Sequence, residues 1–418
     1  MCNNFRFLIV FLTVLTTCPV SAQKEEGRLS LGGCGDAVYV RNFYSDNPGR
    51  YDNPEKYRDD SSHGRFDIPH SILFLQYKFN EGWTFHTKVV FEHTGTASHL
   101  TLNDKGEWEK EVERGGEVAL GEFWLQKTFS EAASIRAGYF IVPVGHFNVN
   151  HEPTRYFTVL KPEGESSVIP GAWHDIGVSF AGRHGDFGYC MQFIAGLDAM
   201  RFGSGSWIKG GGASPFAFKV ANKYGVAARI DNYSVPGLCM SLSGYAGRSV
   251  NNSYPGDVAD DDIKGTVLVG AFDFEYDRYN WIIRGNADYG YLSDASAINE
   301  IKTTLSDIKG MPVNPSPVGK NAFALGIEAG YDVLSNVEMV KRKKLYVFGR
   351  YEYYDTFIAP AGYEKSEASR RTRIAAGLNF CPIPQIVIKA EFSDRLMRGD
   401  IKDEKSLGFG IAYETRFL

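Results

Sequence analysis

The feature that most constrains this chain is a period-two alternation of apolar and polar side chains that recurs along most of its length. Between 281 and 289, for example, Trp281, Ile283 and Tyr289 alternate with Arg284 and Asp288. Because successive side chains of a strand point to opposite faces, such a segment has one apolar and one polar face. The pattern predicts sixteen β-strands, at 29–43, 66–79, 83–93, 118–129, 133–140, 174–182, 187–195, 224–231, 238–247, 265–276, 279–292, 321–333, 344–356, 370–380, 385–396 and 406–418.

The connections between these strands alternate in length. The odd-numbered ones are mostly long, such as 94–117 and 141–173, whereas most even-numbered ones are tight turns, such as 80–82 and 277–278. A soluble sandwich has no reason to sort its loops in this way. A barrel in an outer membrane does, because one rim has short periplasmic turns and the other has long extracellular loops. The turn 334–343 is longer than the pattern predicts.

The two faces of the strands favour the same fold. Lipid cannot hydrogen-bond to the backbone, so a spanning sheet must close on itself, with its apolar face outward and its charges inward. We therefore expect an all-β fold over 23–418, a 16-stranded antiparallel transmembrane β-barrel whose interior is too wide for side chains to fill and holds water. The sequence has no run of 18 apolar residues, which excludes a helical membrane protein. Apolar residues at helical spacing from Ile298 to Ile308 predict one short helix in the loop 293–320.

The N-terminus is typical of a secretory signal. Arg6 precedes an apolar stretch, and the small residues of 20–22 form a cleavage site, so residues 1–22 are expected to be a signal peptide. A lipoprotein signal ending at Cys18 is a weaker alternative. Four cysteines remain in the mature chain, without the Cys-x-x-Cys spacing of a zinc or redox site, and they are either free or paired across strands: Cys34, Cys190, Cys239 and Cys381.

Three sequence segments carry a family resemblance. They are the strand 121–127, the strand and corner 134–145 that end in Val142-Pro143-Val144-Gly145, and the segment 170–178 with Trp173-His174-Asp175-Ile176-Gly177. In this order they resemble the phosphate-selective porin O and P family. The resemblance implies an outer-membrane porin, assembled as a homotrimer, with the third long loop folded into the lumen.

The residues themselves identify 141–173 as the candidate for that inward loop. It is apolar where it leaves its strand and polar further on, where His146, Arg155 and Lys161 are candidate pore-lining residues. A constriction of this kind selects solutes by width and by fixed charge. The candidate basic residues on the wall are Lys88, Arg136, Arg284, Arg350, Arg371, Arg373, Lys389, Arg395 and Arg416. Any one of them could equally be a solvated lumen charge without a selective role.

The inward face also carries many acids, which argues against strong anion selectivity. They are Glu92, Glu122, Asp273, Glu275, Asp288, Glu328, Glu352, Glu391 and Glu414, and the formal net charge of the chain is −5. We expect a channel for passive diffusion of small hydrophilic solutes or ions, general or weakly selective, with anions and phosphate among the candidates. The alternatives are an outer-membrane barrel enzyme and a secreted β-rich glycan-binding protein.

Few other partners are expected. The acidic character of the chain argues against nucleic acid as a partner, and we expect no catalytic residue, no bound metal and no cofactor. The acidic loop residues Asp257, Asp260, Asp261 and Asp262 form a solvated face that could bind divalent ions bridging lipopolysaccharide. Outer-membrane lipid and lipopolysaccharide are therefore the expected surroundings.

Overall fold

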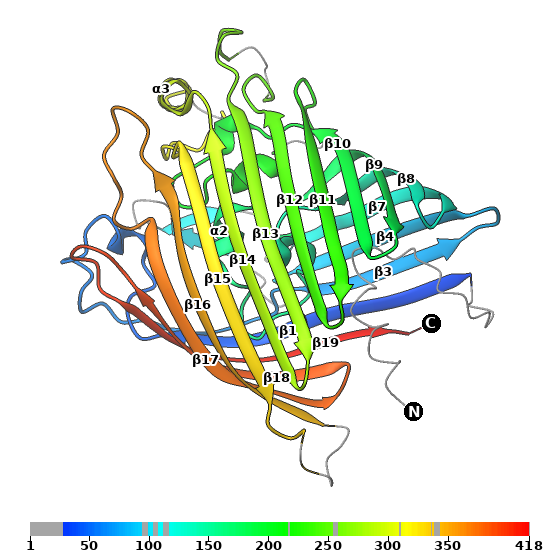
Figure 1. Ribbon diagram of the computed structural model, residues 1–418. Helices are drawn as coiled ribbons and strands as arrows, with labels where there is room; N and C mark the ends of the chain where they lie inside the picture. The colour runs from blue at the N-terminus through cyan, green and yellow to red at the C-terminus, as the bar shows by residue number, and fades with distance from the viewer. Residues whose placement is uncertain are drawn as a thin grey trace.

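The strands form one closed antiparallel barrel (Figure 1). The computed structural model describes residues 28–93, 99–102, 108–111, 117–215, 218–253, 258–308, 311–335, 337 and 343–417; the expected signal peptide lies outside them. The sixteen wall strands are β1 (Leu29–Asn42), β3 (Ser71–Lys78), β4 (Trp83–Glu92), β7 (Glu117–Ser130), β8 (Ala133–Ile141), β9 (His174–His184), β10 (Phe187–Ala195), β11 (Tyr224–Val235), β12 (Leu238–Arg248), β13 (Thr266–Arg278), β14 (Trp281–Leu292), β15 (Asn321–Asp332), β16 (Lys344–Ile358), β17 (Arg370–Ile383), β18 (Ile386–Leu396) and β19 (Glu404–Arg416).

Each wall strand pairs with the next one along the chain, and β1 closes the barrel by pairing with β19 from Gly32 opposite Arg416 to Asn42 opposite Ser406. The predicted fold class is therefore confirmed. The predicted strand 66–79 is interrupted, because Pro69 has no backbone N–H to give to a ladder. The first residues of this predicted strand belong instead to the short strand β2 (Gly64–Asp67), which pairs with β1.

Several elements lie inside the long connections. Strands β5 (His99–Leu102) and β6 (Trp108–Glu111) form a small separate sheet within 94–117, which the sequence pattern did not predict. The helices are η1 (Pro48–Arg50), α1 (His146–Val149), α2 (Glu163–Val168), η2 (Ala199–Arg201), η3 (Lys209–Gly212) and α3 (Ala295–Ser306), the last of which was predicted. Of the helices in the described ranges, none has the length and apolar character needed to cross a lipid bilayer.

The long loops and the short turns lie at opposite ends of the barrel (Figure 1). Between β13 and β14 the turn has only two residues, Tyr279 and Asn280, with φ of 54° and 66°. These left-handed angles match the twist of a tight hairpin. β11 continues to Val235, further than predicted, because Gly237, with φ of 83°, allows an equally tight turn. β1 begins and β19 ends at this short-turn end.

The outer surface of the wall is apolar and the charged side chains of the strands point inward. Along β13, Leu268 and Phe272 are exposed outside, whereas Val269 and Asp273 are buried inside. The same alternation gives most wall strands exposed apolar residues, among them Leu73, Leu125, Ile135, Val178, Phe193, Ile230, Leu242, Ile327, Val347, Ile374, Ile388 and Phe409. Apolar residues spread in this way around a barrel far exceed the patches that soluble monomers expose.

The interior is not lined by polar side chains throughout. Inward residues of the wall such as Val267, Ala271 and Ala324 pack with Trp173 and Trp207 from the long loops, in one large buried cluster that also includes Ile298 of α3. The expectation of a water-filled interior does not account for this part. The alternation of each strand places its side chains, but it gives no information on which loops fold back among them.

Gly138 of β8 is held in a conformation that other residues rarely adopt. Its φ is 136°, and a Cβ there would lie 2.2 Å from the carbonyl oxygen of Phe123 on β7. We expect Gly138→Ala to lower the free energy of unfolding by about 1–3 kcal/mol through backbone strain. Urea titration of the folded protein measures this change. Gly349→Ala on β16, where a Cβ meets nothing within 4 Å, is the control and should differ little from wild type; equal effects of both variants would contradict the argument.

Candidate functional site: the interior loop and the charged wall

The segment 141–173, here called the interior loop, is held inside the barrel by side chains of many strands. Near its start, Gln192 of β10 donates to the Ile141 carbonyl at 3.0 Å, and Arg229 of β11 donates to the Gly145 carbonyl at 3.2 Å. The Gly145 N–H donates to the Ser243 hydroxyl of β12 at 3.1 Å. These three neighbouring strands fix the entry of the loop.

The later part of the loop is held by the opposite stretch of wall. The Val159 N–H donates to Glu391 of β18 at 2.6 Å, and the Gly164 N–H donates to Glu352 of β16 at 2.8 Å. Asn379 of β17 donates to the Phe157 carbonyl at 3.0 Å. These contacts agree with the expected inward fold of the third long loop.

Two inward glycines leave room for side chains of the interior loop. At Gly330 of β15, a Cβ would lie 2.3 Å from the ring of Phe157. At Gly408 of β19, a Cβ would lie 3.2 Å from Val159. The wall is therefore shaped at these positions to seat the loop closely.

Within the loop, polar contacts join its two ends. The carboxylate of Glu165 on α2 accepts from the backbone N–H groups of His146 and Asn148, at 3.1 and 2.8 Å. Asn148 in turn accepts from the Trp173 N–H at 2.6 Å. Burial raises the pKa of the Glu165 carboxyl and lowers the pKa of Lys161 to about 8.

The inner wall carries a ladder of ion pairs between residues directly opposite each other on adjacent strands. Glu275 faces Arg284, Arg284 faces Glu328, and Glu328 faces Arg350. The nitrogen-to-oxygen distances along this series are 2.6, 2.8 and 3.1 Å. Opposite charges at directly paired positions stabilise a sheet, so the ladder reinforces the register of β13 to β16.

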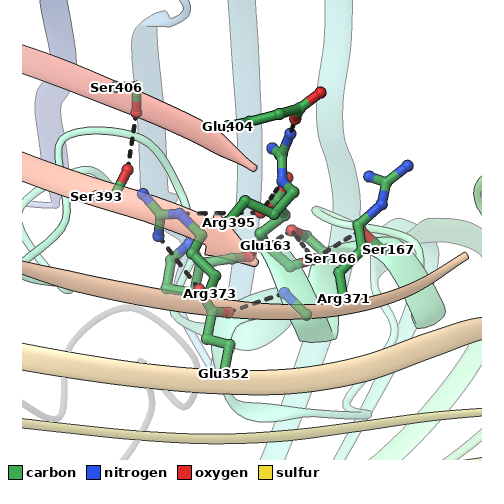
Figure 2. A network of polar contacts seen from close by, with 12 residues as sticks. Glu163, Ser166, Ser167, Glu352, Arg371, Arg373, Ser393, Arg395, Glu404 and Ser406 are labelled. Atoms are coloured by element: carbon green, nitrogen blue, oxygen red, sulfur yellow. Dashed lines mark hydrogen bonds and ion pairs between the residues drawn. The ribbon is translucent and has the colours of Figure 1, made fainter. Parts of the chain in front are cut away.

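The ladder continues through the interior loop. Arg350 pairs with Glu352 at 3.1 Å, and Glu352 pairs with Arg373 of β17 at 3.2 Å. Figure 2 shows the next part, where Glu163 of α2 binds Arg395 of β18, and Arg395 also binds Glu404. Burial alone would raise the pKa of Glu163, but Arg395 and Arg373 outweigh it and lower that pKa to about 2.

The ladder gives several of the predicted pore-lining arginines a structural role in the wall. The Arg284, Arg350, Arg373 and Arg395 guanidinium groups each face one or more carboxylates, and the Arg350 side chain is only 1% exposed. The positive charges of these arginines are therefore balanced by carboxylates, and the four residues do not form a row of free cations. The mixture of inward acids and bases in the sequence indicates such compensation, but which residues pair depends on strand register.

Other predicted residues contact the interior loop. Lys88 of β4 donates to His151 at 2.8 Å, and Arg155 pairs with Glu414 of β19 at 3.1 Å. The ring of His146 lies 3.4 Å from Asp273. Lys389 of β18 donates to three carbonyls of the loop.

The remaining predicted cations differ in their surroundings. Arg136 donates to Gln126 and lies 3.9 Å above the ring of Trp124, and Arg371 donates to the Ala368 carbonyl. Within the described residues, neither these two nor Lys161 forms an ion pair with a carboxylate. Arg416 is exposed at the short-turn end of β19.

Metal-ligating residues do not gather in the described part of the chain, where no group of three or more His, Cys, Asp and Glu side chains is arranged to hold an ion. Cys34, Cys190, Cys239 and Cys381 are all free, which decides between the two possibilities that the sequence left open.

A buried lysine ties the helix α3 to the neighbouring loops. The Lys302 ammonium donates to the carbonyls of Phe202 and Ser316, at 2.5 Å each. Burial lowers its pKa to about 7. Residues that the sequence pattern does not single out, such as Ser243, Asn379 and Lys302, bond backbone groups of distant loops, for which the sequence contains no signal.

Glu328 should be among the most sensitive positions of the wall, because it binds two buried arginines. Removing the charge from a buried pair costs about 3–5 kcal/mol, so we expect Glu328→Gln to lower the free energy of unfolding by about 3 kcal/mol or more. Urea titration again gives the value. The matched control is Glu55→Gln, which removes an exposed pair with Arg58 and should cost under about 1 kcal/mol. If the urea midpoint of Glu328→Gln equals that of wild type, the ladder is not formed.

The contacts of α3 should depend on pH through Lys302. Between pH 7 and 10.5, the pKa of Lys302 in the folded and in the unfolded chain, Lys302 is a neutral amine when α3 is packed and a protonated ammonium when α3 is released. Packing of α3 therefore becomes more favourable as pH rises through this range and weaker toward pH 6. Hydrogen exchange of the α3 amides, corrected for intrinsic rates, should show more protection at pH 9 than at pH 6. Lys302→Met should abolish most of that difference; an unchanged difference would assign it to another group.

Comparison with known proteins gives the fold. No family model matches the chain. An uncharacterized protein of Aquifex aeolicus is 25% identical over 389 residues, which are 90% of this chain and 77% of that protein. Three solved structures superpose over 93% of this chain. They are an anion-selective porin from Comamonas acidovorans (TM-score 0.54, 10% identity, 99% of that chain), the trimer form of the Vibrio cholerae outer membrane protein OmpT (0.50, 12%, 100%) and Pseudomonas putida OprB (0.55, 8%, 94%). At these identities the likeness is one of fold: a closed sixteen-stranded barrel.

Proposed function

We propose that this chain is an outer-membrane porin, a passive channel for small hydrophilic solutes and ions. The observation that carries the proposal is a closed barrel with an apolar outside, charged residues inside and a long loop held within the bore. Lipid accepts only such a closed sheet, and an ionised inner face suits water and ions. The anion-selective porin of Comamonas acidovorans has the same fold, which supports the assignment.

The surroundings follow from the same proposal. Residues 1–22 direct export and are removed, 23–418 form the barrel domain, and the short turns face the periplasm with the long loops outside a Gram-negative cell. Lipid and lipopolysaccharide surround the apolar wall. A homotrimer is the proposed assembly, by analogy with the trimer form of the Vibrio cholerae protein. We assign the chain no catalytic role, and the apolar outer wall disfavours a secreted glycan-binding protein.

The ion-pair ladder favours weak selectivity. Most inward arginines are compensated by carboxylates, so they contribute little field to the solute path. The uncompensated groups Arg136, Lys161 and Arg371 are the proposed determinants of any anion preference. A strong selectivity for phosphate, which the family resemblance implies, would need more free cations than these.

Planar-bilayer recording of the purified protein tests the proposal. We expect discrete conductance steps, a reversal potential close to zero in a salt gradient, and little block by phosphate. Arg371→Gln should shift the permeability toward cations, because it removes an uncompensated charge. Arg58→Gln, on an exposed loop, is the matched control and should leave the reversal potential unchanged. Absence of conductance would contradict the channel assignment; strong anion preference with phosphate block would contradict weak selectivity.

A further inference from the structure

Lys389 of β18 has surroundings unlike those of any other charged group on the described wall. Its side chain is buried, with the residue 2% exposed, and its ammonium donates to the carbonyls of Pro153, Tyr156 and Thr158 at 2.6, 2.8 and 2.8 Å. The ring of Tyr156 lies 4.3 Å from the same nitrogen. An ammonium has three N–H donors, so all of them are used on one short stretch of the interior loop.

The same stretch is held at its other end by a second lysine. Lys88 of β4 donates to His151 at 2.8 Å and lies 3.8 Å from Glu152. Between the two lysines, Arg155 and the Thr154 hydroxyl both bind Glu414 of β19. Residues 151–158, here called the strap, therefore run along the arc of wall from β4 to β18, which contains the seam where β1 meets β19.

The strap is closely packed. Glu152, Tyr156, Phe157 and Thr158 are buried, whereas Leu160, two residues beyond the strap, is 43% exposed. The wall residues beneath it, Cys34, Lys88 and Lys389, are inaccessible to water or nearly so. While the strap stays in place, solutes cannot pass along this arc of the bore.

The strap is attached by the polar contacts described above and by one apolar cluster, in which Phe157 packs against Tyr346 and Phe348. In the described residues, Lys389 forms no ion pair, and a buried charge without a counter-ion is tolerated only where dipoles replace its water. The three carbonyls of the strap supply those dipoles. Each side of this contact needs the other, because an apolar side chain at 389 would leave three buried carbonyls without donors.

We propose that Lys389 is the positioning residue of the channel, a clasp whose ammonium holds the strap across this arc of the lumen and so sets the width of the bore. The inference rests on the proposed function, since width matters only to a channel. An arginine does not replace it, because a planar guanidinium cannot direct its donors at three converging carbonyls.

The first measurement needs no channel activity. Hydrogen exchange of the strap amides is compared in the full chain, folded in detergent, for wild type, Lys389→Met and Lys344→Met. Lys344 of β16 also faces inward, but it bonds the Tyr346 hydroxyl, whose ring packs against Phe157, rather than a carbonyl of the strap. It serves as the matched control for the loss of an inward ammonium. We expect Lys389→Met alone to accelerate exchange of the strap at least tenfold. Exchange equal to wild type would overturn the clasp.

The second measurement is single-channel conductance of the same variants. We expect Lys389→Met to conduct at least twofold more than wild type, and Lys344→Met to conduct like wild type. Faster exchange without a conductance change in a conducting protein would mean that the strap does not set the width. If wild type and all variants fail to conduct while exchange responds as expected, the channel assignment fails and the clasp stands.

Chemical rescue separates the clasp from a general loss of packing. In Lys389→Ala, added propylammonium should restore wild-type conductance and exchange, because it brings back three N–H donors. Tetramethylammonium has the same charge and no N–H donor, so it should not restore them. Rescue by both ions, or by neither, would contradict the carbonyl clasp. If Lys389→Met fails to fold, Lys389→Gln replaces it, because glutamine keeps two N–H donors without the charge. Strap exchange and conductance should then rise in the same direction by smaller factors.

Discussion

The structure depends on one constraint, the fixed register of a closed sheet whose side chains alternate between two environments. Once β1 pairs with β19, no strand can slip by one residue without turning its charged face outward. Register then decides which inward residues meet. Glu328 lies between Arg284 and Arg350 because of strand pairing alone, and the resulting ladder balances the charges on the inner face of β13 to β16.

How much of this could be predicted from the sequence follows from the range of each signal. The strands were found because alternation is local, and the tight turns followed as the gaps between them. The interruption at Pro69 is equally local, but the apolar pattern continues on both sides of it and so predicts a single strand. The position of the interior loop was predicted in outline, but its contacts with Asn379 and Lys389 join residues more than 200 positions apart. No pattern within either segment encodes them.

The charged residues show why a list of inward cations does not define a site. Arg373 and Arg371 (Figure 2) lie two residues apart on the same face of β17, and Arg373 binds Glu352 and Glu391. Arg371 instead donates to the Ala368 carbonyl and lies over the ring of Tyr51, and among the described residues it forms no ion pair. Their spacing in the sequence predicts the same role for both arginines. The electric field in the bore depends on cations without a carboxylate partner, such as Arg371, because a paired charge is largely cancelled within a few ångströms.

The interior loop combines two kinds of attachment, and they differ in how they respond to water. Its ends, at Val142, Val144 and Trp173, lie in the large apolar cluster, where leaving would expose apolar surface and is opposed at any ionic strength. Its middle, from His151 to Glu163, is attached mainly by charged and polar contacts, which water and salt can replace. A loop built in this way can change its middle part while its ends stay fixed. In the proposed channel, adjustment of the bore would thereby be confined to the arc of wall that this middle part contacts, from β16 to β4.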